Sequence, residues 1–314
     1  MKKPAKTPAK TPIKTKALDP RAPLWNIPIQ AAKDWLADDA LHLAAAISFY
    51  TVFAMAPLIL ILTAVTAFVF GSDAAYTHVG AQVEALMGKQ GRDVFASVTE
   101  SAKDPGSGIA ATIIGAVTLL IGASAIFGEL QGALNKIWEI EPRPGRGIRR
   151  FIRTRLLSFA LVFATAFLLI VSLAVSTTLS TFTSWAEQSL LAPAWVLVIA
   201  NLTLSFVVIT VLFATIYKFL PDAIIDWREV WLGAAATSLL FAIGKWLIGL
   251  YLARASVASA YGAAGSLVAA LVWVYYSSMI FLYGAELTQV HARLLGAGIR
   301  PSRDAQMVTD AKSA

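Results

Sequence analysis

Six long apolar stretches divide this chain of 314 residues, and they limit its fold more than any other feature. They are Leu43–Phe70, Ile109–Phe127, Leu156–Phe182, Ala194–Ile216, Val230–Tyr251 and Leu267–Val290. At 1.5 Å per helical residue, each is about as long as crossing a hydrocarbon core of about 30 Å requires. Apolar residues make up 57% of the chain, against about 45–50% in soluble domains. The sequence therefore predicts an all-α, polytopic membrane bundle with six transmembrane helices.

The Lys and Arg residues alternate between the connections, and this pattern predicts how the bundle is oriented. Of the 26 basic residues, 21 lie before the first stretch, after the last one, or in the second and fourth connections. Four lie in the other three connections, and Lys245 lies inside the fifth stretch. Because Lys and Arg are enriched in cytoplasmic connections, both termini are predicted to be cytoplasmic.

Shorter segments flank and connect the spans. Residues 1–24 are rich in Pro, Lys and Thr and predict a disordered cytoplasmic tail. Residues 293–314 predict a second cytoplasmic tail, which leaves a membrane domain at 25–292. The pattern from Trp25 to Leu41 predicts a helix in the membrane interface that leads into the first span. In the long outer connection, 71–108, two apolar stripes at helical spacing predict short amphipathic helices that cap the outer face.

Pro57 lies near the middle of the first span. Proline removes one backbone hydrogen bond and its ring clashes with the carbonyl four residues earlier, so a kink is expected. Pro57 is therefore a candidate hinge, and an ordinary role in helix packing is the alternative.

Four blocks of sequence resemble the YihY/BrkB family of bacterial inner-membrane proteins. The blocks are DALHLAAAISFY at 39–50 followed by Pro57; LNKIW at 134–138; FLPD at 219–222 with Trp227, Arg228 and Gly233 after it; and YGAAG at 261–265 with WVYY at 273–276 and GAEL at 284–287. They occur in the family's order over about residues 35–292. The resemblance implies a multi-pass protein of the bacterial inner membrane with six helices. Members of the family carry labels as virulence factors, transporters and, in older usage, ribonuclease BN.

The ribonuclease label is tested by the residues that metal-dependent hydrolysis needs. Such a site requires a cluster of His, Asp or Glu around an open metal position. The three histidines, His42, His78 and His291, are far apart in the sequence, and no cysteine is present. The sequence therefore favours a protein that is not an enzyme, binds no metal or cofactor, and has no nucleic-acid partner. A membrane-bound nuclease is the least favoured reading.

Lys245 is the most informative polar residue inside the spans, because an ionisable group in hydrocarbon is costly and usually functional. Counted from the inner end of the fifth span, it lies roughly two-thirds of the way across. Asn201 and Tyr275 fall at a similar depth in the fourth and sixth spans. These three residues form a candidate ligand site for an anionic lipid or a small anion. The alternative for Lys245 is snorkelling, in which its long stem carries the ammonium to the outer surface.

A second candidate site lies at the inner ends of the spans. The acidic residues Asp38, Asp39, Glu129 and Glu286 are predicted to converge there, near the arginines of the second connection. Interfacial salt bridges are one interpretation of this inner-face cluster, and a path for protons or ions is the other.

These features favour a transporter or lipid-handling protein that binds or moves an anionic amphiphile. The alternative is a membrane scaffold that recruits partners for envelope assembly without transporting anything. Membrane lipids are the expected partners in either case. No internal repeat is evident in the six spans, so a homo-oligomer is one way to supply the second half that many transporters have.

Overall fold

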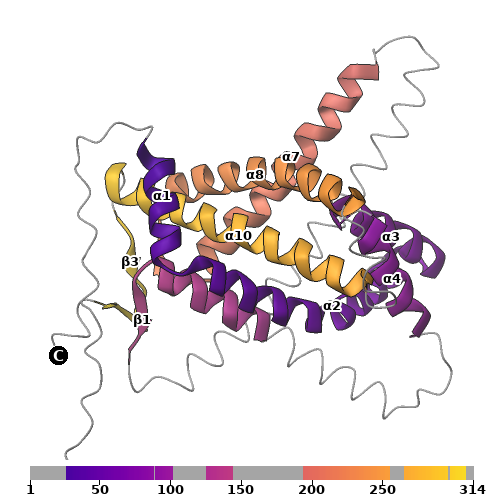
Figure 1. Ribbon diagram of the computed structural model, residues 1–314, viewed down its shortest axis with the longest axis horizontal. Coiled ribbons are helices and arrows are strands. Elements are labelled where there is room, and N and C mark those ends of the chain that lie inside the picture. Colours follow the sequence, from indigo (N-terminus) through magenta and orange to yellow (C-terminus); the bar gives the residue numbers. More distant parts are fainter. Residues whose placement is uncertain are drawn as a thin grey trace, which may run out of the picture.

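The computed structural model describes residues 26–87, 89–101, 125–143, 194–254, 265–295 and 298–308, and most of these are helical. The long helices are α2 (Ala40–Phe70), α7 (Ala194–Phe219), α8 (Trp227–Arg254) and α10 (Gly265–Leu295). The shorter ones are α1 (Asn26–Ala37), α3 (Ser72–Met87) and α4 (Lys89–Ser101), together with helical residues 125–137. Figure 1 shows α1 at one end of the bundle, which we call the α1 end, and α3 with α4 at the other, which we call the cap end.

Three of the described helices are long and apolar enough to cross a membrane. These segments are Leu202–Phe219, Trp227–Ile248 and Leu267–Leu294, and a fourth is added if α1 and the first part of α2 count as one bent span. They match the predicted fourth, fifth, sixth and first spans. The third predicted span and nearly all of the second lie outside the described residues. The helical nature of the bundle is therefore confirmed, whereas the number of six spans and the orientation stay predictions.

The chain bends sharply between α1 and α2. The two helices meet at 70°, and Asp39 at the junction has a left-handed backbone with φ of 62°. This confirms a helix ahead of the first span and shows that it is a separate element. Ile27 and Ala31 bury one side of α1 against Leu287 and Val290 of α10. The opposite side leaves Ile29 and Leu36 exposed.

The two amphipathic helices predicted in the long connection are confirmed as α3 and α4. Ile59 of α2, Val79 of α3 and Phe95 of α4 form a buried apolar cluster that fastens the pair to the bundle. On the exposed side, Arg92 and Glu84 form an ion pair at 2.5 Å, and their hydrogen bond raises the pKa of the Arg92 guanidinium.

Two short antiparallel strand pairs at the α1 end were not predicted, and they correct the purely helical expectation. β1 (Ile140–Pro142) pairs with β4 (Ala305–Met307), and β2 (Ala223–Ile224) pairs with β3 (Arg300–Pro301). The segment after α10 therefore folds back against two connections that are distant in the sequence. The strands have only two or three residues, too few for alternation of apolar and polar residues to be recognisable.

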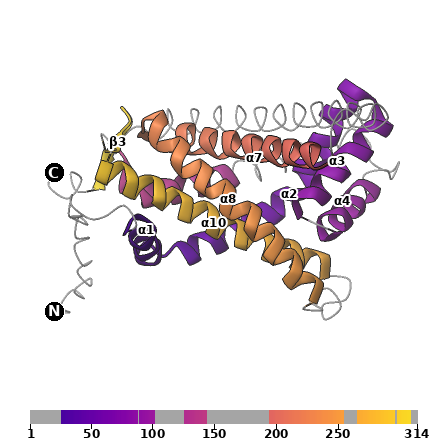
Figure 2. The ribbon, with the colours of Figure 1, turned by 90° about the horizontal axis from the view of Figure 1, so that it is seen from above.

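The principal buried cluster also lies toward the α1 end. Leu134 and Ile137 of the 125–137 helix and Trp138 just after it pack there. Their partners are Tyr217 of α7 and Phe281 and Leu282 of α10. Figure 2 shows α7 and α8 converging toward the α1 end, where Tyr217 of α7 reaches α10. The core thus holds the ends of several helices and both strand-bearing connections together.

Candidate functional site

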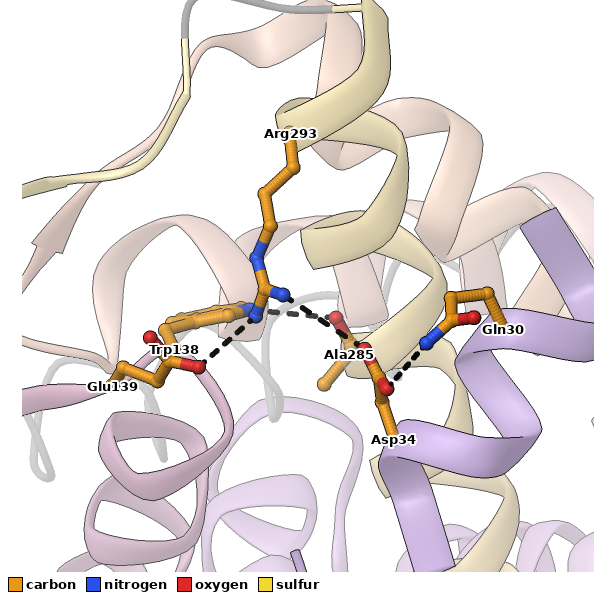
Figure 3. A network of polar contacts seen from close by, with 6 residues as sticks. All are labelled: Gln30, Asp34, Trp138, Glu139, Ala285 and Arg293. Carbon is orange, nitrogen blue, oxygen red and sulfur yellow. Dashed lines mark hydrogen bonds and ion pairs between the residues drawn. The ribbon is translucent and has the colours of Figure 1, made fainter. Parts of the chain in front are cut away.

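A polar network joins three segments at the α1 end (Figure 3). The Asp34 side chain in α1 is only 2% exposed, and its Oδ2 lies 3.8 Å from Nη1 of Arg293 in the last turn of α10. Gln30 Nε2 donates a hydrogen bond to the other carboxylate oxygen of Asp34 at 2.8 Å. Nη2 of Arg293 lies 3.5 Å from Oε1 of Glu139. One guanidinium therefore connects carboxylates from two other segments.

The local sequence explains why these side chains meet. Asp34 follows Ile27 and Ala31 at helical spacing, so it lies on the side of α1 that is buried against α10. Glu139 ends the helix of residues 125–137 in a left-handed conformation, with φ of 56°. Its carbonyl accepts a hydrogen bond from Val308 N at 2.9 Å, next to β4. A cation in the last turn of α10 is also favoured by the helix dipole.

A second buried polar pair lies beside the strand-bearing connections. Asn135 Nδ2 donates to Oδ2 of Asp222 at 3.0 Å, and the backbone N of Asp222 donates to Asn135 Oδ1 at 2.9 Å. Both residues are buried. Because both the nitrogen and the oxygen of the Asn135 side-chain amide are used, the pair fixes the position of the connection between α7 and α8 relative to the 125–137 helix.

Substituting Asn135→Leu keeps a similar volume but removes both hydrogen bonds. We expect it to destabilise the protein by about 1–3 kcal/mol, the cost of leaving buried polar groups without these partners. Lys136→Leu is the matched control because the neighbouring Lys136 is exposed. Thermal unfolding of the purified proteins in detergent measures both. Equal midpoints for the two variants would contradict this role of Asn135.

α8 and α10 cross at two glycine–threonine pairs. A Cβ on Gly284 would lie 1.7 Å from Thr237 Oγ1, and a Cβ on Gly233 would lie 1.8 Å from Thr288 Oγ1. Each threonine hydroxyl donates to the carbonyl of the glycine four residues earlier in its own helix. The two helices therefore present the same Gly-x-x-x-Thr pattern to one another, and each threonine packs on the other helix's glycine. Small residues at such crossings let helix backbones approach closely.

Neighbouring helices donate two further hydrogen bonds to backbone carbonyls of α10 near this crossing. Tyr217 of α7 donates its hydroxyl to Phe281 O at 2.7 Å, with Thr237 Oγ1 at 3.0 Å. Trp138 Nε1 donates to Ala285 O at 3.4 Å. These contacts fix α10 relative to α7 and to the 125–137 helix, close to the network in Figure 3.

The predicted inner-face cluster is distributed over several surroundings. Glu286 in α10 is fully buried, whereas Asp39 is exposed and Asp38 is partly buried at the bend between α1 and α2. Glu129 is partly buried in the 125–137 helix. The network of Figure 3 instead takes its carboxylates from Asp34 and Glu139. Joint action of Asp38, Asp39, Glu129 and Glu286 stays a prediction.

Sequence reasoning did not single out four of the buried carboxylates among the described residues, those of Asp34, Asp222, Glu229 and Asp304. For Asp34 a signal existed, because it shares a helical face with two buried apolar residues. Asp222 directly follows a proline in a connection, and no periodicity marks such a position as buried. A charged residue at helical spacing from buried apolar residues, as Asp34 is from Ile27 and Ala31, could therefore have been identified as buried from the sequence.

Lys245, the predicted ligand residue, lies on the exposed side of α8. The described residues beside it on α8 include the exposed apolar Ile243, Trp246 and Leu247, and Trp246 is 68% exposed. Tyr275 is partly buried and packs against the principal core cluster. Lys245 and Tyr275 therefore have different surroundings. Asn201 belongs to α7, and its side chain is outside the described part of the structure.

Pro57 lies within α2, which continues as one helix from Ala40 to Phe70. Its side chain is outside the described part, and its role as a hinge stays a prediction. Within the residues that the structure describes, no group of three or more His, Asp or Glu side chains is arranged to hold a metal ion.

Comparison with known proteins gives one family and a consistent set of relatives. The family model described as "Virulence factor BrkB" matches residues 31–308. The match extends beyond residue 292, the limit expected from the sequence blocks, and includes both strands of the segment after α10. No solved structure matches the chain.

The relatives are described as UPF0761 membrane proteins. One from Verminephrobacter eiseniae is 29% identical over 280 residues, which cover 88% of this chain and 64% of the relative. One from Pseudomonas aeruginosa is 28% identical over 261 residues, covering 82% and 60%. One from Alkalilimnicola ehrlichii is 26% identical over 270 residues, covering 85% and 58%. The chain therefore matches less than two thirds of the length of these relatives.

Proposed function

This chain belongs to the virulence factor BrkB family and is a membrane protein, and from this premise we propose that it is a transport or lipid-handling protein that binds an anionic amphiphile on the exposed side of α8. The observation that carries the proposal is the position of Lys245, a cation on an exposed and otherwise apolar helix face. In a membrane protein, such a face is in contact with lipid.

The surroundings of Lys245 fit the headgroup of an anionic lipid. Ile243, Trp246 and Leu247 are exposed around it, and Tyr251 follows further along the helix. Lys245 lies about 27 Å along the helix axis from Trp227 at the start of α8, which is close to the thickness of a hydrocarbon core. Trp and Tyr are enriched at this level of a membrane. Counted from Trp227 and with its long stem extended toward the outer surface, Lys245 brings its ammonium to the depth where an anionic headgroup meets its acyl chains.

The proposed arrangement places the protein in the bacterial inner membrane as a multi-pass protein with both termini in the cytoplasm. The support is the excess of Lys and Arg in the connections on one side of the predicted spans. In this orientation the α1 end faces the cytoplasm, and Lys245 lies toward the outer leaflet.

Native mass spectrometry of the purified protein tests the role of Lys245. We expect the wild type to retain an anionic lipid, Lys245→Arg to retain it, and Lys245→Ala to lose it. Lys89→Ala is the matched control, since it removes an exposed lysine at the cap end. Equal retention by wild type and Lys245→Ala would contradict the proposal and favour snorkelling. Crosslinks from α3 and α4 to other envelope proteins, unchanged in Lys245→Ala, would then favour the scaffold alternative.

A further inference from the structure

A cluster of aromatic and basic side chains lies where α7 ends and α8 begins, and we call it the α7–α8 corner. It consists of Lys218, Phe219, Ile224, Trp227, Arg228, Trp231 and Arg300. These residues come from the last turn of α7, strand β2, the first turns of α8 and strand β3. Figure 1 shows that the start of α8 and β3 are both at the α1 end, away from the cap. The corner is thus at the opposite end of α8 from Lys245.

The aromatic part of the corner is a continuous row. The ring centroids of Phe219 and Trp227 are 5.9 Å apart, and those of Trp227 and Trp231 are 6.3 Å apart. These three side chains and Ile224 are between 43% and 54% exposed. Tryptophan rings with both a buried and an exposed side are typical of the boundary between lipid headgroups and acyl chains.

The basic part of the corner is held in place by its surroundings. The Lys218 ammonium donates a hydrogen bond to the carbonyl of Ile225, and it lies 5.5 Å from the centroid of the Trp227 ring. An ammonium above an indole ring is in the geometry of a cation–π interaction. Lys218 is therefore positioned on the aromatic row, and two of its three N–H donors are not used by the Ile225 carbonyl.

The strand pair adds a further cation to the corner. Arg300 is directly opposite Ile224 in the ladder between β2 and β3, and both are exposed. Opposite residues in an antiparallel pair have their side chains on the same face. Arg228 is exposed on the first turn of α8, and Asp226 is the exposed carboxylate nearest to it in the sequence. The segments that carry the exposed apolar side chains of the corner thus also carry three cations, Lys218, Arg228 and Arg300.

We propose that the α7–α8 corner binds an anionic phospholipid of the leaflet at the α1 end. The phosphate contacts Lys218, Arg228 and Arg300, and the acyl chains lie along Trp227 and Trp231. Anionic lipids are abundant in the cytoplasmic leaflet, and basic pockets between transmembrane helices bind their headgroups. The apolar row selects a lipid over a soluble anion, because a soluble anion gains nothing from the exposed rings. This site is independent of Lys245 and of the function proposed for it.

The test compares two charge-matched double variants in detergent micelles containing phosphatidylglycerol. Lys218→Gln/Arg228→Gln removes two cations of the corner. Lys33→Gln/Lys136→Gln removes two exposed cations of the α1 end that have no place in the aromatic row. Native mass spectrometry reports bound phosphatidylglycerol, and the shift in unfolding temperature with phosphatidylglycerol reports binding to the folded protein. Circular dichroism confirms that each variant is folded.

We expect the corner variant to bind phosphatidylglycerol roughly 25-fold more weakly than wild type, since it loses two basic residues and each one near an anionic surface contributes about a factor of five. The control variant and Lys218→Arg should bind within about twofold of wild type, and Trp227→Ala should weaken binding without any change in charge. Equal weakening in both double variants would overturn the proposal in favour of general charge attraction. Equal competition by inorganic phosphate and by phosphatidylglycerol would show a soluble-anion site instead. Loss of lipid in Lys245→Ala with no loss in the corner variant would overturn this proposal and would support the function proposed for Lys245.

Discussion

Alanine at Gly284 should destabilise the protein more than any other change of one methyl group that the structure suggests. Its Cβ would lie 1.7 Å from Thr237 Oγ1 and 2.6 Å from the Tyr217 hydroxyl. Overpacking of a core costs about 1–3 kcal/mol and occasionally more, and here α8 and α10 must move apart. We therefore expect a loss of about 3 kcal/mol, seen as a fall of roughly 5–10 °C in the thermal unfolding midpoint in detergent.

The opposite pair of the crossing provides a rescue experiment. Gly233→Ala should also destabilise, and adding Thr288→Ala should recover part of the loss, because the hydroxyl at 1.8 Å is then absent and the next atom is at 3.0 Å. Gly132→Ala is the control, since its Cβ would have no neighbour within 4 Å. In a helix that control is expected to be neutral or stabilising by up to about 1 kcal/mol. A Gly284→Ala protein as stable as Gly132→Ala would refute the close crossing.

Removing the charge of Arg293 should also destabilise the α1 end. Arg293→Met takes away the guanidinium that lies between the Asp34 and Glu139 carboxylates. Breaking a fully buried pair costs about 3–5 kcal/mol. The Arg293 side chain is 22% exposed and 3.8 Å from Asp34, so we expect about 2 kcal/mol, measured as the shift in the unfolding midpoint.

A double-mutant cycle separates this interaction from lost packing. If the charges interact, Asp34→Asn should cost less in the Arg293→Met background than in wild type, because the charge it removes is no longer paired. Arg92→Met breaks the exposed pair with Glu84 at the cap end, and surface pairs contribute only about 0–1 kcal/mol. Additive effects of the Asp34 and Arg293 substitutions would show that the network adds no coupling.

The parts of this fold that could be predicted from sequence are those with a long, regular pattern. Apolar runs of twenty or more residues identified α2, α7, α8 and α10. Two separate stripes at helical spacing identified α3 (Val79, Val83, Leu86 and Met87) and α4 (Val94, Phe95 and Val98). Both signals come from residues within one element. The strand pairs join segments as distant as residues 140 and 307, and two or three residues per strand carry no periodicity.

The candidate site shows the same division between local and long-range information. Lys245 was recognisable because a charge within an apolar run is unusual, whatever it contacts. The partners of Arg293 were not recognisable, since depth along each span gives only one coordinate of a position in the bundle. The face that each helix turns toward its neighbours supplies the rest. In α1 that face carries Asp34, and in α8 it carries Gly233 and Thr237.

The contact between the first and last described helices has a consequence for the order of assembly. Tyr283 in α10 donates a hydrogen bond at 3.1 Å to the carbonyl of Pro28, which is 255 residues earlier in the chain. At about 5–20 residues per second, the ribosome needs on the order of tens of seconds to make the intervening chain. Until α10 is made, α1 cannot pack against Leu287 and Val290. Likewise, β1 and β2 cannot pair before β4 and β3 are made. The α1 end is therefore completed only after α10 and the strands that follow it have been made, so a chain truncated after residue 280 would leave its first helix undocked.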